Sequence, residues 1–197
     1  MSLDKRKTSH PFLFLQTGFK GTFDYIVPFN VAGANIDAVA DRYFASPIVI
    51  PFRCRIDKIG IYPSVPLTGN CLLGLHRSTG TTVLVPSTKV CGTAAFNANT
   101  MIDTAWKWVA PTTAEIVPAG FYFAGWVNSI VYQNGVSGMR AKAFRMDGTD
   151  GTTWNDGACA GTYHLAAVGG IVPASLATAS VNQNHYMMLL GLKVTPA

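Results

Sequence analysis

The most strand-like run of the chain lies between Ile116 and Val127, where aromatic and aliphatic residues follow a turn in the stretch IVPAGFYFAGWV. Pro118 and Gly120 redirect the backbone at its start, because proline fixes φ and glycine permits positive φ. The alternation then divides the residues between two faces of a strand, with Phe121, Phe123, Gly125 and Val127 on one face and Tyr122, Ala124 and Trp126 on the other. Aromatic and β-branched residues favour strands. The stretch therefore predicts the strand around which the others gather.

Further short strands are predicted on both sides of this one. We expect them over Phe23–Phe29, Tyr43–Phe52, Arg53–Tyr62, Cys71–His76, Thr82–Val90, Met139–Met146 and Tyr186–Val194. Turn signals separate them about every eight to twelve residues, which is typical of a sandwich or barrel. The sequence therefore predicts an all-β fold built as an antiparallel β-sandwich.

The stretch Arg53–Tyr62 alternates with one irregularity. Ile59 and Ile61 share a face, but Ile56 falls on the other. One extra residue in the strand reverses the alternation and defines a β-bulge. We expect a bulge near Asp57–Lys58, which would place all three isoleucines inside.

Two strands have predicted positions in their sheets. Pro47 and Pro51 indicate an edge strand over Tyr43–Phe52, because proline cannot donate to a strand ladder. Tyr186–Val194 is apolar on both faces at its start, and strands buried on both faces have this pattern. We therefore expect the second stretch to be a central strand.

Two other stretches predict departures from extended structure. Asn35–Tyr43 has apolar residues at helical spacing, which favours a helical turn. Asn134 and Gly135 form the pair most typical of a two-residue hairpin turn. A helical turn is therefore expected in the first stretch and a hairpin in the second.

The first 20 residues are expected to form an N-terminal arm. Basic residues come first and an apolar tetrad follows, in the order Lys5, Arg6, Lys7, then Phe12, Leu13, Phe14 and Leu15. An exposed apolar tetrad favours association. We therefore expect the arm to dock on a neighbouring subunit or on its own sandwich, which is a single domain over residues 21–197.

The composition favours an assembly. Hydrophobic residues make up 49% of the chain and charged residues 13%, against about 25% charged in an average globular protein. Such a surface carries apolar patches that usually mark interfaces, so we expect a homo-oligomer. The net charge of +5 is scattered over several short clusters and does not predict a nucleic-acid-binding stripe. No apolar run approaches the about 18 residues of a transmembrane helix.

Four stretches together resemble jelly-roll modules of tailed-bacteriophage virion proteins. They are RIDKIGIYPSV, GNCLLGLHRSTGTTVLVPS, WKWVAPTTAEIVPAGFYFAGWV and the terminal YMMLLGLKV. The resemblance implies a jelly-roll sandwich and a non-enzymatic structural role in the virion, associated with the tail, a fibre or the baseplate, or as a capsid decoration (cement) protein of the head. It also implies a homotrimer, partners among other virion proteins and assembly in the host cytoplasm. The modules are similar to carbohydrate-binding sandwiches, which makes host attachment through surface glycans an alternative. The segment 129–185 departs from the compact pattern and is expected to be an insertion carrying surface loops.

Exposed aromatic rings are the first candidates for ligand binding. Trp106 and Trp108 alternate around one residue and therefore face the same way. With Tyr122 and Trp126 they could form a platform for a sugar, and Trp126 is the best candidate for exposure. The alternative is core packing, which we favour because aromatic residues dominate core burial.

The stretch DGTDGTTWNDG, residues 147–157, predicts a loop with a second candidate site. Asp147, Asp150 and Asp156 could supply oxygens to calcium, although their spacing differs from that of an EF-hand loop. Trp154 could instead stack on a sugar ring at a receptor-contact tip. An ordinary polar loop is the third alternative.

No pattern of residues predicts catalysis, a cofactor or a metal site. The four histidines are far apart, no motif has zinc-finger or nucleophile-elbow spacing, and Glu115 is the only glutamate, for which a surface salt bridge is expected. The four cysteines are widely spaced and are expected to be buried free thiols. We therefore expect a protein that is not an enzyme.

Overall fold

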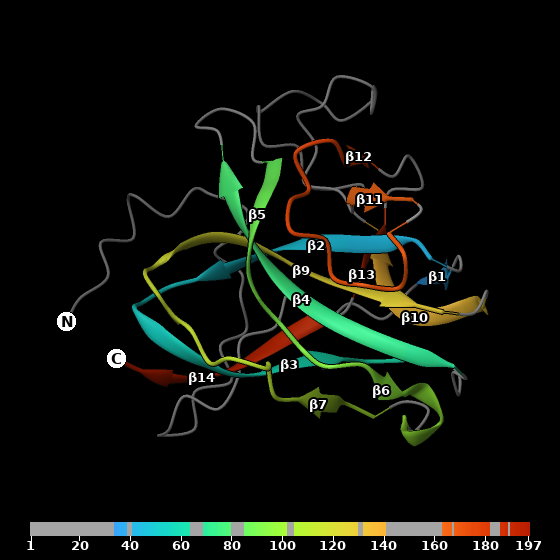
Figure 1. Ribbon diagram of the computed structural model, residues 1–197, viewed down its shortest axis with the longest axis horizontal. Coiled ribbons are helices and arrows are strands. Elements are labelled where there is room, and N and C mark those ends of the chain that lie inside the picture. The colour runs from blue at the N-terminus through green and yellow to red at the C-terminus, as the bar shows by residue number, and fades with distance from the viewer. Residues whose placement is uncertain are drawn as a thin grey trace.

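The computed structural model describes residues 34–38, 41–63, 69–79, 85–101, 105–129, 132–140, 163–166, 168–181, 186–188 and 190–197. Within these residues the regular secondary structure is β-strand, apart from one short 3₁₀ turn, η3 (Ala98–Thr100). The strands pair in antiparallel sheets that pack as a sandwich (Figure 1). This confirms the predicted all-β antiparallel fold. No helix in the described part is both long and apolar enough to cross a membrane.

The largest sheet has seven strands, in the order β12-β11-β2-β9-β4-β5 with β6 also paired to β4. Their bounds are β2 (Tyr43–Ile50), β4 (Asn70–Thr79), β5 (Val85–Gly92), β6 (Phe96–Asn97), β9 (Gly120–Asn128), β11 (Tyr163–Leu165) and β12 (Ser180–Val181). The predicted organising strand is β9, which pairs with β2 on one side and β4 on the other. It crosses the middle of the molecule in Figure 1.

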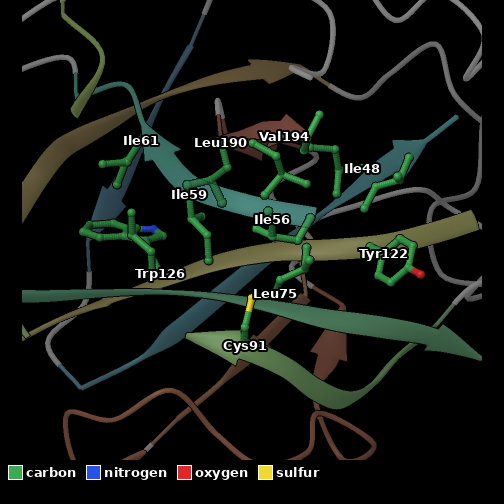
Figure 2. Close-up of a cluster of buried hydrophobic side chains, with 14 of the residues drawn as sticks. Ile48, Ile56, Ile59, Ile61, Leu75, Cys91, Tyr122, Trp126, Leu190 and Val194 are labelled. Atoms are coloured by element: carbon green, nitrogen blue, oxygen red, sulfur yellow. The ribbon is translucent and has the colours of Figure 1, made fainter. Parts of the chain in front are cut away.

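A second sheet of four strands covers one face of the large sheet. It contains β3 (Cys54–Ile61), β7 (Lys107–Val109), β8 (Ile116–Val117) and β14 (Leu190–Pro196), with β3 in the middle. The core between the two sheets includes Trp126 and Leu75 from the large sheet and Ile56, Ile59 and Leu190 from the smaller one (Figure 2). Burial of these side chains is the main stabilising contribution of the sandwich.

The opposite face of the large sheet is also buried. Phe123 and Val127 of β9 pack there with Tyr43 of β2, under Val172 and Leu176 from the segment 168–181. Both faces of β9 are therefore covered, which explains why aromatic and aliphatic residues occupy both sides of its alternation. The two predicted faces of this strand are confirmed.

The β-bulge predicted in β3 is confirmed. Lys58 pairs with Lys193 of β14, but the next pair is Ile56 with Val194, which leaves Asp57 as the extra residue. Ile56, Ile59 and Ile61 are all fully buried as a result. The Asp57 carboxylate accepts hydrogen bonds from Arg55 Nε at 2.7 Å and from the Thr195 hydroxyl at 2.5 Å, which fix the bulge between the strands.

A third sheet, in the order β1-β10-β13, corrects two predictions. It contains β1 (Ala34–Ala38), β10 (Tyr132–Arg140) and β13 (Tyr186–Met188). The predicted helical turn after Asn35 is wrong, because β1 pairs with β10. The predicted Asn134–Gly135 hairpin is also wrong, because both residues lie within β10. The register of this pairing shifts beside them, between Ile36 and Ala38 of β1, so the local irregularity takes the form of a bulge.

The sheet positions of two strands differ from prediction. β2 pairs with β9 along its whole length, but its other side pairs, among the described strands, only over Tyr43–Ala45, with β11. The predicted edge is therefore found at Pro47 but not over Tyr43–Ala45. β14 pairs only with β3 among the described strands and lies at the edge of the smaller sheet. The prediction of a central strand over Tyr186–Val194 is therefore wrong, because this stretch supplies parts of two sheets.

The N-terminal arm, residues 1–20, lies outside the described residues and stays a prediction. Most of the predicted loop insertion, 129–185, also lies outside them. Its described part is more than surface loops, because β11 and β12 extend the large sheet and Val172 and Leu176 close its second core. The one-domain organisation is likewise a prediction.

Candidate functional site

The candidate site is a group of aromatic side chains beside a lysine on the outside of the smaller sheet. Trp106 and Trp108 stack with ring centroids 4.8 Å apart, and Tyr62 meets Trp106 edge-to-face at 5.6 Å. Lys193 Nζ lies 5.1 Å from the centroid of the Trp108 ring. All four side chains are half-buried. We call these four residues the aromatic–lysine cluster.

The register of β3 and β7 places this cluster. Trp108 lies opposite Gly60, and Ile59 and Ile61 on either side of Gly60 point into the core. Trp108 therefore belongs to the outer face of the sheet. A Cβ atom at Gly60 would lie 2.4 Å from two ring carbons of Trp108, so the indole covers this glycine at van der Waals distance. Glycine here permits the close approach of the ring to the sheet.

The electrostatic character of the cluster is basic. Lys193 of β14 is paired in register with Lys58 of β3, and like charges at directly opposed positions repel. The ammonium group of Lys193 is placed over the Trp108 ring, whose electron-rich face attracts a cation. Lys107 lies between the two tryptophans and pairs with Ile61, so it belongs to the opposite face of β7 and adds no charge to the cluster. The surface can therefore offer stacking and positive charge together.

Two members of the predicted aromatic platform lie elsewhere. Trp126 is fully buried and stacks on Phe44 at 6.4 Å in the core between the sheets (Figure 2). Tyr122 is also buried, and its hydroxyl donates to the carbonyl of Pro118 at 3.0 Å. The suggestion that Trp126 binds a ligand is wrong, because both sides of β9 are covered and no ring face is open. The core-packing alternative holds for these two residues.

Trp106 and Trp108 are the predicted aromatic residues that the structure leaves accessible. Their predicted common orientation is confirmed by the stacking of their rings. Tyr62 and Lys193 were not predicted as site residues. The signal for them is the glycine at position 60 followed by Tyr62 in β3, but the pairing of β3 with β14 that brings in Lys193 has no local signature.

Trp154, Asp147, Asp150 and Asp156 lie outside the described residues, as do the arm residues Lys5 to Leu15. The structure therefore does not test the loop site or the docking arm. No group of histidine, cysteine and carboxylate side chains in the described part is arranged to hold a metal ion.

His76 is buried in the second core. Its Nε2–H donates to the carbonyl of Pro173 at 2.9 Å, which leaves Nδ1 to accept from the Tyr43 hydroxyl at 3.4 Å. The Tyr43 ring meets the imidazole edge-to-face at 5.3 Å. Burial lowers the pKa of His76 to about 4, against the smaller opposing effect of the hydrogen bond to Pro173. This histidine anchors the segment 168–181 to the large sheet.

The described cysteines are Cys54, Cys71 and Cys91, and all are free and buried. Burial raises the pKa of Cys54 to about 11 and that of Cys91 to about 12, and it raises the pKa of Cys71 further. A thiol must ionise to act as a nucleophile. These three side chains are therefore packing residues, as predicted.

No protein-family model, curated protein or solved structure matches this chain.

Proposed function

We propose that this chain is a non-enzymatic structural component of a tailed-bacteriophage particle, associated with the tail or a fibre and assembled as a homo-oligomer. The resemblance of its strand sequences to jelly-roll virion modules supports this role, and the same resemblance implies a trimer. The antiparallel β-sandwich is consistent with the sandwich fold that this resemblance implies. Capsid decoration of the head is the alternative place in the particle.

The observation that carries the proposal is the aromatic–lysine cluster. Stacked Trp106 and Trp108 remain half-buried on the outer face of a sandwich whose two inner cores are filled. Tryptophan and tyrosine are enriched among the residues that dominate the energetics of protein interfaces. The charged fraction of 13% adds the low charge density that subunit contacts favour. The cluster is therefore the described surface best suited to contact another subunit.

Two measurements test this proposal. Mass spectrometry of purified particles should find the chain, and light scattering of the isolated protein should give a multiple of its 21.1 kDa mass.

The change Trp106→Ala should weaken association at least tenfold, because it removes a half-buried aromatic anchor. Ile116→Ala is the matched control, since Ile116 is an exposed apolar residue of the same sheet. Absence of the protein from purified particles would contradict the proposal. A stable monomer of the unmodified protein, with both tryptophans present, would also contradict it.

A carbohydrate-binding module for host glycans is the second candidate function. The half-buried rings of Trp106 and Trp108 favour it, because the apolar face of a sugar stacks on aromatic rings. In this case Trp106→Ala should abolish adsorption to host cells and leave the oligomer mass unchanged. If the cluster instead mediates assembly, Trp106→Ala should lower both the oligomer mass and the adsorption to host cells. The oligomer mass therefore distinguishes the two candidate functions.

A further inference from the structure

A separate cleft of about 480 Å³ lies beside β5, at the edge of the large sheet. Its lining includes the charged side chains of Lys89 and Glu115, three threonines of which Thr113 is one, and apolar side chains that include Ile171 and Val172. It shares no residue with the aromatic–lysine cluster. Its volume lies within the range of about 300–1,000 Å³ that small-molecule sites occupy.

The cleft exists because the outer edge of β5 is covered at both ends. Lys89 N–H donates to the carbonyl of Ala174 at 2.9 Å, which attaches the segment 168–181 to one end. Thr112 donates to the carbonyl of Gly92 through its N–H and its hydroxyl, each at 2.8 Å, which attaches the chain after β7 to the other. The cleft opens along β5 between these attachments. Backbone hydrogen bonds therefore hold its walls in place before any ligand arrives.

Two opposite charges face this cleft. Lys89 and Glu115 both influence the thiol of Cys91, which lines the cleft, and they do so in opposite directions. Within the part of the chain that the structure describes, the two side chains form no ion pair with each other or with another residue. The surface salt bridge predicted for Glu115 is therefore not found among these residues. A donor and an acceptor remain available to a ligand.

We propose that this cleft binds a neutral saccharide. Sugar hydroxyls both donate and accept, so they can meet the carboxylate of Glu115, the ammonium group of Lys89 and the hydroxyl of Thr113 at once. Ile171 is 58% exposed and can pack against the C–H face of a pyranose ring. An anionic sugar would be attracted by Lys89 but repelled by Glu115, and a cation would meet the reverse, so neither gains a net electrostatic advantage over a neutral sugar. A free amino acid could satisfy both charges but would leave Thr113 and the apolar wall unused.

Saturation-transfer NMR with the methyl glycosides of glucose, galactose, mannose and N-acetylglucosamine tests the proposal. At least one should bind to the full chain with a dissociation constant on the order of 1 mM. Thr113→Trp should abolish this binding by filling the cleft. Thr88→Trp is the matched control, because Thr88 is an exposed threonine of β5 that does not line the cleft, and it should bind as the unmodified chain does. Glu115→Gln should weaken binding about tenfold through loss of a charged acceptor.

Three results would overturn the proposal. They are no binding of any of the four glycosides, equal binding by the Thr113→Trp variant, and tighter binding of methyl glucuronide or free lysine than of every neutral glycoside. Thermal unfolding of each variant shows whether the fold is intact. The result is independent of the proposed particle role, because Thr113→Trp should leave the oligomer mass and the presence of the chain in particles unchanged.

Discussion

Gly60 and Trp108 are opposite each other on β3 and β7, and the indole ring occupies the space where a side chain at position 60 would begin. The same indole stacks on Trp106, with the ring centroids 4.8 Å apart. The cluster therefore depends on glycine at position 60, because a side chain there would occupy the space of the Trp108 indole. This pair connects the register of the smaller sheet to the surface that we propose for assembly.

The change Gly60→Ala should displace Trp108 and destabilise the fold by about 1–3 kcal/mol, the usual cost of overpacking. The added Cβ would lie 2.4 Å from two ring carbons, so the ring must shift. Denaturant unfolding measures the loss of stability, and tryptophan fluorescence reports the altered stacking.

Gly120→Ala provides the matched control for this change. Gly120 is also a strand glycine, but a Cβ there would lie 3.6 Å from the nearest side-chain atom, which is ordinary contact. Its unfolding free energy and fluorescence should stay close to those of the unmodified chain. Equal losses for the two variants would show that Trp108 does not lie on Gly60.

The sequence predicts those features of the fold that depend on alternation within one strand. The two faces of β9 follow from a period of two, and so does the bulge at Asp57, because three isoleucines could be buried together only if one residue were added. Such inferences need no knowledge of the partner strand. They succeed because burial of apolar side chains constrains each strand separately.

Features that depend on which strands become neighbours were not predictable in this way. Asn134 and Gly135 satisfy the local rule for a hairpin, yet pairing with β1 extends the chain through them. The burial of Trp126 follows from the aromatic residues on both faces of β9, but the residues of β3 and β14 that cover it could not be identified from that strand alone. The cleft beside β5 likewise joins residues near positions 90, 113 and 171. These arrangements arise from long-range contacts, which a single strand pattern does not encode.

Replacing the large buried side chains of β9 with alanine should strongly destabilise the protein. Trp126→Ala and Phe123→Ala should each lower the unfolding free energy by about 3–5 kcal/mol, through lost burial and a cavity. The two residues lie in different cores and are at most 1% exposed. Ile116→Ala, at a site 49% exposed, should cost less than about 1 kcal/mol. Thermal melts compare the three variants, and an unchanged melt for Trp126→Ala would contradict its place in the core.

The buried thiols should be unreactive in the folded protein. In a Cys159→Ser variant the remaining cysteines are Cys54, Cys71 and Cys91, whose pKa values are raised by burial. At about pH 8 they should fail to react with a disulfide reagent until denaturant is added, because neither access nor thiolate is available. Counting released thiolate by absorbance tests this expectation. Rapid reaction of one thiol without denaturant would place that cysteine at the surface.

The buried histidine should make stability depend on pH. The folded-state pKa of His76 is about 4, below the ordinary value of 6.5, so the unfolded chain binds more protons between these values. The contribution of the neutral His76 to the free energy of unfolding is complete above pH 6.5 and is lost as the pH falls towards 4. The difference of two and a half units corresponds to about 3 kcal/mol. Unfolding free energies measured in urea between these pH values should show this decline.

The charged and titratable groups around His76 define the control. Tyr43 approaches from β2 and its pKa is raised well above the ordinary range by burial, so it stays neutral throughout, while the charge of Lys89 on β5 opposes protonation of the imidazole. The acid sensitivity therefore belongs to His76 and to its bond with Pro173. In His76→Gln the amide can still donate to that carbonyl but does not titrate, so the stability curve should flatten between pH 4 and 6.5. Equal slopes in the two proteins would assign the acid sensitivity to other groups and remove His76 from this role.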